Sequence, residues 1–166
     1  AFLDSYHRLT HLPEPEYKTV SVPALFTKLE RLLQAEPRSE RVVYCDGKAD
    51  KSTGKELQVY GDANLLTLAL INLIRNALQA VEGQEDGIVR VDTCAGATGH
   101  LLITITDNGP GIPPERLSAI FTPFFSTKSG GSGIGLPISQ RIMQLHGGQL
   151  SVSSIPNVRT EFRMEF

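Results

Sequence analysis

Two glycine-rich turns in the second half of the chain carry the residues best suited to chemistry. An alternating stretch at residues 101–106 ends on Asp107, and a tight turn follows at residues 108–112, NGPGI. Further on, residues 130–135, GGSGIG, open an apolar helix. Glycines ahead of a helix let backbone N–H groups approach phosphate oxygens, and the helix N-terminus adds partial positive charge. A carboxylate beside one turn and a phosphate-binding loop in the other predict a nucleotide site.

Each turn also has a plain structural explanation. Most glycine-rich segments are simply turns, and Asp107 could end its strand in an Asx-turn. The two turns therefore support a nucleotide site only when a third element points to the same site.

A pair of asparagines in a predicted helix supplies that element. Asp62 can cap a helix that runs to about Val81, and Asn72 and Asn76 lie one turn apart at the border of its apolar face. Asparagine is unfavourable inside a helix, so two of them call for a reason. Their side-chain oxygens suit a hard cation such as Mg²⁺; the alternative is a pair of border amides that bond to solvent or to a loop. Leu68 and Ile71 fall on the polar side and need a covering element to explain them.

Composition limits the class of protein. The 166 residues predict one domain with a real core. A net charge of −2 without a basic block argues against a nucleic-acid partner. Cys45 and Cys94 lie in apolar runs without metal spacing, so we expect reduced, buried thiols. No apolar run approaches the roughly 18 residues of a membrane span, and no signal peptide is recognisable.

Hydrophobic periodicity predicts an alternation of strands and helices. The predicted strands are residues 18–22, 41–45, 57–60, 88–94, 101–106, 149–153 and 159–166. The predicted helices are residues 21–35, capped by Ser21, 62–81, a short one from 113, and 136–145, ended by His146-Gly147-Gly148. The helix over 62–81 has one broad apolar face, made of Leu66, Leu70, Leu73, Ala77 and Val81.

The first residues predict the end of another helix. Apolar side chains at helical spacing precede Pro13 and Pro15, and the chain opens in mid-pattern without Met. We therefore expect a fragment of a longer protein, with residues 1–16 as a helix end and linker and 17–166 as the domain. His7 and His11 are better explained as surface histidines than as phosphate acceptors.

Four ordered motifs resemble those of a known family. They are Asn72-x-x-x-Asn76, DNGPGI at 107–112, FTPFFSTK at 121–128 and GSGIGL at 131–136. This order resembles the catalytic, ATP-binding domain of sensor histidine kinases, a group shared with DNA gyrase, Hsp90 and MutL. The resemblance covers residues 18–166. It implies an α+β fold, the two-layer Bergerat sandwich: a mixed, mostly antiparallel sheet with helices on one face and a flexible ATP lid.

The resemblance also implies a role for each motif residue. Asp107 would accept the adenine amino hydrogen, with Thr160 supporting it, and Asn76 would coordinate Mg²⁺ while Asn72 lines the phosphate region. Lys128 would reach the terminal phosphates. The remaining positions of the implied ATP site are Gly109, Gly111, Ile112, Gly131, Ser132, Gly133, Ile134, Gly135 and Leu136. Aromatic residues of the third motif would anchor the lid or simply fill the core: Phe121, Phe124 and Phe125.

Three departures from the family pattern matter. Gln79 stands where many members carry a lysine, as in kinases that resemble the nitrogen-regulation sensors. The last glycine motif is replaced by residues 156–160, PNVRT, which puts the closing turn in doubt. The lid, residues 121–130, is short, so ATP is expected to be held loosely.

The implied activity is phosphoryl transfer. Hydrolytic relatives carry a glutamate at the position of Asn72, and an amide is a poor general base, so slow hydrolysis is expected. The γ-phosphoryl would pass to a histidine on a separate dimerisation domain and then to a response regulator. Neither the phosphoacceptor motif nor the regulator is in this chain, which is expected to be monomeric within a homodimeric parent. The expected location of this domain is cytoplasmic. Anchoring of the parent protein in the inner membrane stays open.

Two other interpretations remain open from the sequence. An ATPase or serine kinase of the same fold is the alternative enzyme. A nucleotide-binding scaffold that has lost transfer is the alternative without catalysis.

Overall fold

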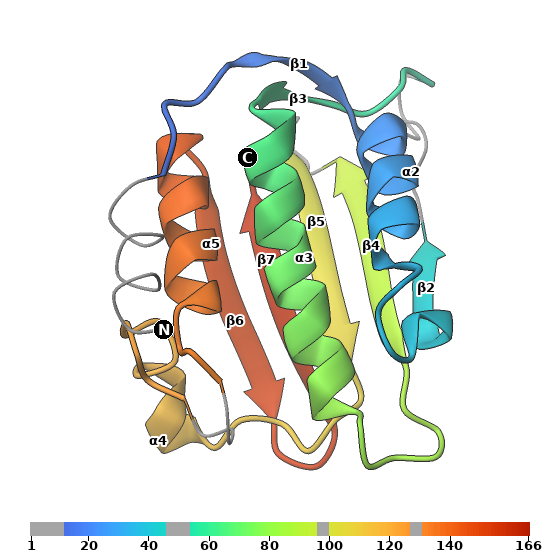
Figure 1. Cartoon of the computed structure of the whole chain (residues 1–166), viewed down its shortest axis with the longest axis vertical. Coiled ribbons are helices and arrows are strands. Elements are labelled where there is room, and N and C mark those ends of the chain that lie inside the picture. The colour runs from blue at the N-terminus through green and yellow to red at the C-terminus, as the bar shows by residue number, and fades with distance from the viewer. Residues whose placement is uncertain (1–11, 46–53, 96–99, 127–130) are drawn as a thin grey trace.

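The computed structural model describes residues 12–45, 54–95, 100–126 and 131–166. Three helices lie over one face of a five-stranded sheet (Figure 1). The helices are α2 (Val22–Leu33), α3 (Ala63–Ala80) and α5 (Gly135–Leu145). The strands are β2 (Val42–Cys45), β4 (Val89–Ala95), β5 (Leu101–Asp107), β6 (Gln149–Ile155) and β7 (Arg159–Glu165).

The sheet has the order β2-β4-β5-β7-β6 and is mostly antiparallel. Only β2 and β4 run parallel, whereas β4–β5, β5–β7 and β6–β7 are antiparallel pairs. The α+β sandwich with a mixed sheet is therefore confirmed.

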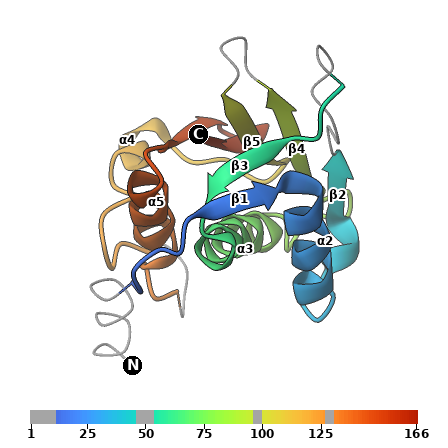
Figure 2. The ribbon, with the colours of Figure 1, turned by 90° about the horizontal axis from the view of Figure 1, so that it is seen from above.

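A second small sheet closes one end of the sandwich. The strands β1 (Lys18–Ser21) and β3 (Gln58–Gly61) pair antiparallel and cross the ends of the helices, as the view from above shows (Figure 2). The sequence predicted both strands but not their separation from the main sheet. Two short elements complete the fold, η1 (Ser39–Arg41) and α4 (Pro114–Leu117).

The core forms between the sheet and α3. In β5 the residues Leu101, Ile103 and Ile105 are buried toward the helices, while the alternate residues are half-buried on the other side. All five residues of the predicted apolar face of α3 are buried. Burying each leucine or valine side chain contributes about 1.5–3 kcal/mol, so this layer fixes α3 against the sheet.

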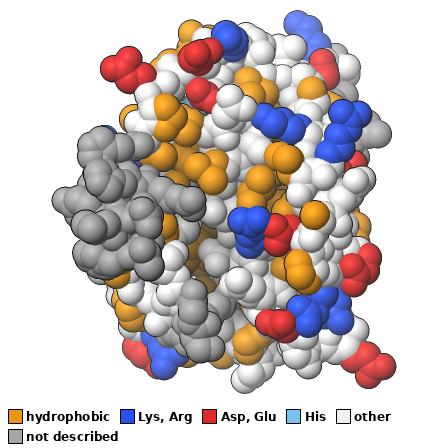
Figure 3. Space-filling view, in the orientation of Figure 1, with side chains coloured by type: hydrophobic (Ala, Val, Ile, Leu, Met, Phe, Trp, Pro, Cys, Tyr) orange, Lys and Arg blue, Asp and Glu red, His pale blue; other side chains and the backbone are white. Residues whose placement is uncertain are grey.

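The outer side of the helix layer remains partly apolar. Leu68 is 38% exposed, in keeping with its predicted place on the polar side of the helix. The same placement is wrong for Ile71, which is partly buried against the core. The space-filling view shows patches of apolar side chains between charged ones on this face (Figure 3). Within the described residues, none of the helices is both long and apolar enough to cross a bilayer.

Helix ends follow the predicted caps. Ser21 Oγ accepts a hydrogen bond from Ala24 N at 3.2 Å, and Asp62 Oδ1 accepts one from Asn64 N at 2.8 Å. After α5, Gly147 has a φ of +69° and Gly148 N donates to Met143 O, which is the predicted glycine end.

The prediction for the cysteines is wrong in part. Cys94 is exposed and Cys45 is only half-buried. Both lie on the side of their strands that faces away from the helices, and the helices cover one face of the sheet only. An apolar run alone could not reveal which of its residues would face the open side.

Candidate functional site

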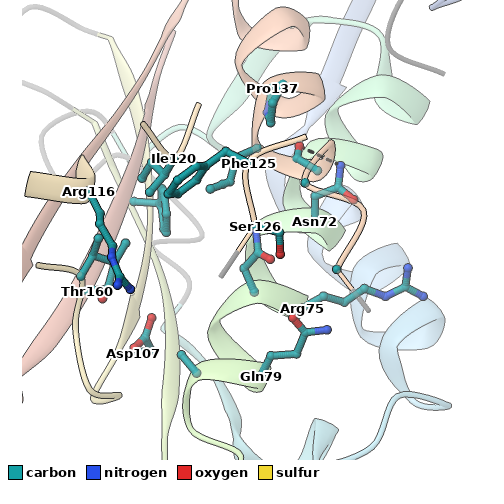
Figure 4. A pocket seen from close by; sticks show the side chains of 18 of the residues that line it. Asn72, Arg75, Gln79, Asp107, Arg116, Ile120, Phe125, Ser126, Pro137 and Thr160 are labelled. Atoms are coloured by element: carbon teal, nitrogen blue, oxygen red, sulfur yellow. Dashed lines mark hydrogen bonds between the residues drawn. The ribbon is translucent and has the colours of Figure 1, made fainter. Parts of the chain in front are cut away.

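One cavity lies between α3, the ends of β5 and β7, and the segment that leads into α5. Its volume is about 580 Å³, within the usual range for a small-molecule site. Figure 4 shows Asp107 and Thr160 at one end and Asn72 toward the other, with Phe125 and Ile120 along the wall between them. The cavity therefore has two chemically different ends.

Asp107 forms the floor of the first end. It is the last residue of β5, is 3% exposed, and lies opposite Thr160 of β7 in the sheet register. Gly109 N donates to Asp107 Oδ1 at 2.9 Å, so the carboxylate is held in an Asx-turn as well as facing the cavity. A Cβ on Gly109 would lie 2.7 Å from that same oxygen and 3.0 Å from Ala80 Cβ, so only glycine packs there.

The β6–β7 hairpin holds the turn that follows Asp107. Asn157 N donates to Pro110 O at 2.8 Å, and Ile112 N donates to Ser154 Oγ at 2.8 Å. Ser154 Oγ also lies 3.1 Å from Thr160 Oγ1. The sequence did not single out Ser154, because a serine in an alternating strand carries no signal of its own.

The hairpin turn itself explains the missing glycines of the last motif. Val158 N donates to Ile155 O at 3.0 Å, which closes a four-residue turn with Pro156 in its second position. Asn157, in the third position, has a φ of 58°. Asparagine tolerates this left-handed region better than other non-glycine residues, so Asn157 replaces the glycine and the turn still closes.

The second end of the cavity is built from backbone. Gly133 has a φ of +65°, and its carbonyl accepts a hydrogen bond from Phe124 N at 2.9 Å. The helix α5 starts two residues later, at Gly135, without a side-chain hydrogen bond to cap it. The partial positive charge of a helix N-terminus favours an anion at this end. Asn72 Nδ2 donates to Gly135 O at 3.4 Å and links α3 to this loop.

The structure brings most of the predicted site residues to this one cavity. Its lining includes Asn72, Asn76, Asp107, Gly111, Ile112, Gly131, Ser132, Gly133, Gly135, Leu136 and Thr160. Gly109 packs beneath Asp107, and Ile134 is buried and lines a neighbouring cavity instead. Lys128 lies outside the described residues. Arg75, Arg116 and Ser126 also line the cavity and were not predicted, because no motif marks them.

The aromatic residues of the third motif divide between two roles. Phe121 and Phe125 pack partly against the core, and Phe125 also lines the cavity. Phe124 is 39% exposed and has a φ of 66°. Core packing therefore applies to Phe121 and Phe125, and anchoring of the lid stays a prediction.

A second cluster joins the far ends of α3 and α5, away from the cavity. His146 Nε2 accepts from Asp62 N at 2.9 Å while its Nδ1 lies 2.7 Å from Ile142 O, which defines the neutral tautomer with the proton on Nδ1. Tyr17 Oη donates to Leu145 O at 2.6 Å, and Glu16 N donates to Asp62 Oδ2 at 2.8 Å. This cluster ties the segment ahead of β1 to both helices.

The Asp62 carboxylate is stabilised as an anion in that cluster. Burial alone would raise its pKa, but the N–H groups of Glu16, Leu65 and Asn64 donate to the carboxylate and lower it. The hydrogen bonds outweigh the desolvation, so the pKa of Asp62 lies below its usual value.

Fold and site together define a class of protein. A carboxylate at the end of a sheet strand, and an uncapped helix start behind a glycine loop, face one cavity of an α+β sandwich. This is a nucleotide-binding arrangement.

The comparison with protein families gives the particular family. Residues 61–166 match the model described as histidine kinase-, DNA gyrase B-, and HSP90-like ATPase. The chain belongs to this family, and membership implies ATP binding. The chain is homologous to the catalytic domain of sensor histidine kinases.

Individual relatives agree with this result. The sensor histidine kinase ZraS of Salmonella typhimurium is 43% identical over 98 residues, which cover 59% of this chain and 21% of the relative. The sensory histidine kinase/phosphatase NtrB of Vibrio alginolyticus is 34% identical over 163 residues, which cover 92% of this chain and 45% of the relative. The chain therefore spans less than half the length of these relatives.

Solved structures share the fold. The catalytic domain of the histidine kinase ThkA, in a nucleotide-free form, has a TM-score of 0.74 and 27% identity over 91% of this chain and 95% of that chain. A structure of ThkA in complex with the response regulator protein TrrA has a TM-score of 0.76 at 22% identity, which shows the fold alone; it covers 99% of this chain and 46% of that chain.

Proposed function

We propose that this domain binds ATP with Mg²⁺ and donates the γ-phosphoryl group to a histidine on a separate dimerisation domain of the same parent protein. The phosphoryl group then passes to a response regulator. The observation that carries this proposal is the position of Asp107 and of the glycine loop at opposite ends of one cavity. A buried carboxylate suits an adenine amino group, and open backbone N–H groups suit phosphates.

The residues of α3 fit a magnesium ion held together with phosphates. Asn76 and Asn72 line the cavity, and amide oxygens are ligands that Mg²⁺ accepts. The described residues hold no group of three or more His, Cys, Asp or Glu side chains that would make an all-protein metal site. Mg²⁺ usually keeps several waters and is shared with substrate phosphates, which agrees with one asparagine ligand, Asn76.

The cavity favours transfer over hydrolysis. Among the described lining residues, Asp107 is the only carboxylate, and it lies at the proposed base end. Asn72, near the glycine loop, is an amide and cannot take a proton from water. The domain therefore supplies positioning and charge neutralisation, which are most of what phosphoryl transfer requires. The incoming imidazole nitrogen forms the N–P bond as the bond to the leaving ADP oxygen breaks.

The relatives support the proposed partners. ZraS and NtrB are described as histidine kinases, and ThkA has been crystallised with a response regulator. We infer a homodimeric parent, in which residues 1–16 lead from the dimerisation domain, and a cytoplasmic position for this domain, where ATP is found.

Calorimetric titration with ATP and Mg²⁺ tests the proposal, repeated on Asp107→Asn. The amide presents an N–H where the carboxylate accepts one, so we expect affinity to fall by at least about tenfold, the effect of losing a hydrogen bond to a charged group. Absence of binding by the wild type would support the scaffold alternative. Binding that is unchanged in Asp107→Asn would mean that the base lies elsewhere.

Transfer needs a second assay with the intact parent protein. Phosphohistidine is labile in acid, whereas phosphoserine survives it. Acid-stable labelling would therefore replace the proposal by the serine kinase alternative.

A further inference from the structure

Among the residues that the structure describes, two arginines line the cavity, and their surroundings differ. Arg75, on α3, donates from Nε to Glu36 Oε1 at 3.0 Å and forms an ion pair with the same carboxylate. In Figure 4 its guanidinium points away from Asp107. The charge of Arg75 is therefore already balanced on the outer side of α3.

Arg116 comes from the opposite wall, and its backbone is held firmly. Arg116 N donates to Pro113 O at 2.9 Å, and Arg116 O accepts from Ala119 N at 2.9 Å and from Ile120 N at 3.2 Å. Ile120 is buried in the core, which fixes this short helical segment to the body of the domain. The root of the Arg116 side chain therefore has a defined position above the cavity.

The Arg116 side chain runs down toward the base end. Figure 4 shows it extending past Thr160 toward Asp107. Within the described part of the chain its guanidinium makes no hydrogen bond or ion pair, in contrast to that of Arg75. A planar cation that none of the described residues neutralises thus lies at the end of the cavity where Asp107 would hold a base.

A guanidinium in this place has two possible uses. It can stack flat on an aromatic ring, which gains both from dispersion and from the attraction of a cation to the π-face. It can instead pair with a phosphate. The position favours the first use, because the glycine loop and the start of α5 lie at the other end of the cavity from Asp107.

We propose that Arg116 stacks on the base of the bound nucleotide and closes the Asp107 end of the cavity. This rests on the proposed function, because it needs a nucleotide with its base at Asp107. Arg116 is then a determinant of affinity for the base itself, while the phosphates are held by other groups.

The test compares three ligands that share the base and differ in charge. Adenosine, ADP and ATP, the last two with Mg²⁺, are titrated by NMR or calorimetry into the wild type, Arg116→Ala and Arg116→Lys. Stacking predicts that Arg116→Ala weakens all three ligands by a similar factor, about two- to fivefold at an exposed site. Arg116→Lys keeps the charge but loses the planar group, so it should not restore full affinity.

A matched control is Arg31→Ala, which removes an exposed arginine on α2 that does not line the cavity. Its affinities should equal those of the wild type. A phosphate contact instead predicts that the loss in Arg116→Ala grows from adenosine to ATP and that lysine restores it. That result, or equal affinities in wild type and Arg116→Ala, would overturn the inference.

Failure of the inference can be told apart from failure of the proposed function. If Asp107→Asn weakens ATP binding and Arg116→Ala does not, the nucleotide site stands and only the stacking role falls. If the wild type binds none of the three ligands, both fall together. Thermal unfolding of Arg116→Ala should match the wild type, because the side chain is exposed and surface substitutions of this kind change stability little.

Discussion

The two ends of the cavity are built in different ways. The base end is assembled from three strands and cross-linked by hydrogen bonds, from Gly109 N to Asp107, from Ile112 N to Ser154 and from Asn157 N to Pro110. The phosphate end is loop backbone ahead of α5, joined to its surroundings by Phe124 N to Gly133 O and by a longer bond from Asn72. The base end thus inherits its shape from the sheet, whereas the phosphate end depends on local backbone conformation. A variant that damages the phosphate end should therefore leave the base end intact, and a comparison of adenosine with ATP separates the two.

The largest effect is expected from Gly111→Ala. Gly111 has a φ of +73°, and a Cβ would lie 2.7 Å from Ile155 O, so the turn must separate from the hairpin. Binding of adenosine and of ATP should both fall more than about tenfold, because strain of about 1–2 kcal/mol adds to the clash. NMR titration measures both affinities.

Gly83→Ala is the control for that variant. A Cβ on Gly83 would meet no atom within 4 Å, and its φ lies outside the left-handed region, so its affinities should not change. Equal behaviour of the two variants would mean that the hairpin contact does not shape the base end.

Gly133→Ala should damage the phosphate end selectively. A Cβ there would lie 2.5 Å from the Phe124 carbonyl carbon, and the φ is +65°. We expect ATP affinity to fall about tenfold or more, with adenosine affinity nearly unchanged. The comparison uses the same titrations as for Gly111→Ala.

Gly135→Ala is the matched control at this end. A Cβ on Gly135 would lie 3.7 Å from Asn72 Cγ, an ordinary contact, and alanine favours the first turn of α5. ATP affinity should stay within about twofold of the wild type. Loss of adenosine binding in Gly133→Ala would contradict the independence of the two ends.

Ser154→Ala should loosen the base end more gently. It leaves Ile112 N without its acceptor, which costs about 1–3 kcal/mol when the group is buried. Chemical denaturation should show the lower stability, and adenosine affinity should fall modestly. Ser153→Ala, on the exposed side of the same strand, is the control and should change neither.

The smallest effect on binding is expected at Asp62, which touches neither end. Its pKa is lowered in the folded state, so the charged form stabilises the fold above the unfolded pKa near 3.8. This contribution is lost as the pH falls through the lower, folded-state pKa. Asp62→Asn should remove that part of the acid dependence of the unfolding free energy, with ATP affinity unchanged at neutral pH.

Denaturation curves collected between neutral and acidic pH measure this difference. His146→Ala serves as a companion variant, because it removes the acceptor for Asp62 N but leaves the carboxylate bonds. Lower nucleotide affinity in Asp62→Asn would mean that the cluster at the far ends of α3 and α5 affects the cavity. The base and phosphate ends of the cavity would then depend on this distant part of the fold.

The predictable parts of the site were those with a local chemical signature. Asp107 follows an alternating strand, which marks it as a strand end. The glycines lie where positive φ or close packing is needed, so their motifs predicted the turns. Asn72 and Asn76 stood out because they oppose helix propensity. Ser154 and Arg116 have no such signature, since a strand serine and a surface arginine are ordinary until the chain brings them to the cavity.

Asn157 shows why a motif can mislead. The sequence without glycines suggested a damaged closing turn, but the turn requires a left-handed residue rather than a glycine, and asparagine meets that need. The cysteines show the opposite case, in which an apolar run suggested burial and the open side of the sheet exposed Cys94.

The sequence by itself determined the elements, their caps and the chemical types in the four motifs, because these depend on periodicity and on local backbone preference. Only the tertiary structure decided which strand ends meet. The register of β5 with β7 places Thr160 beside Asp107, and the β6–β7 hairpin supplies Ser154 to the turn. Such contacts join residues more than forty positions apart, and their geometry follows from packing α3 onto the sheet rather than from any local pattern.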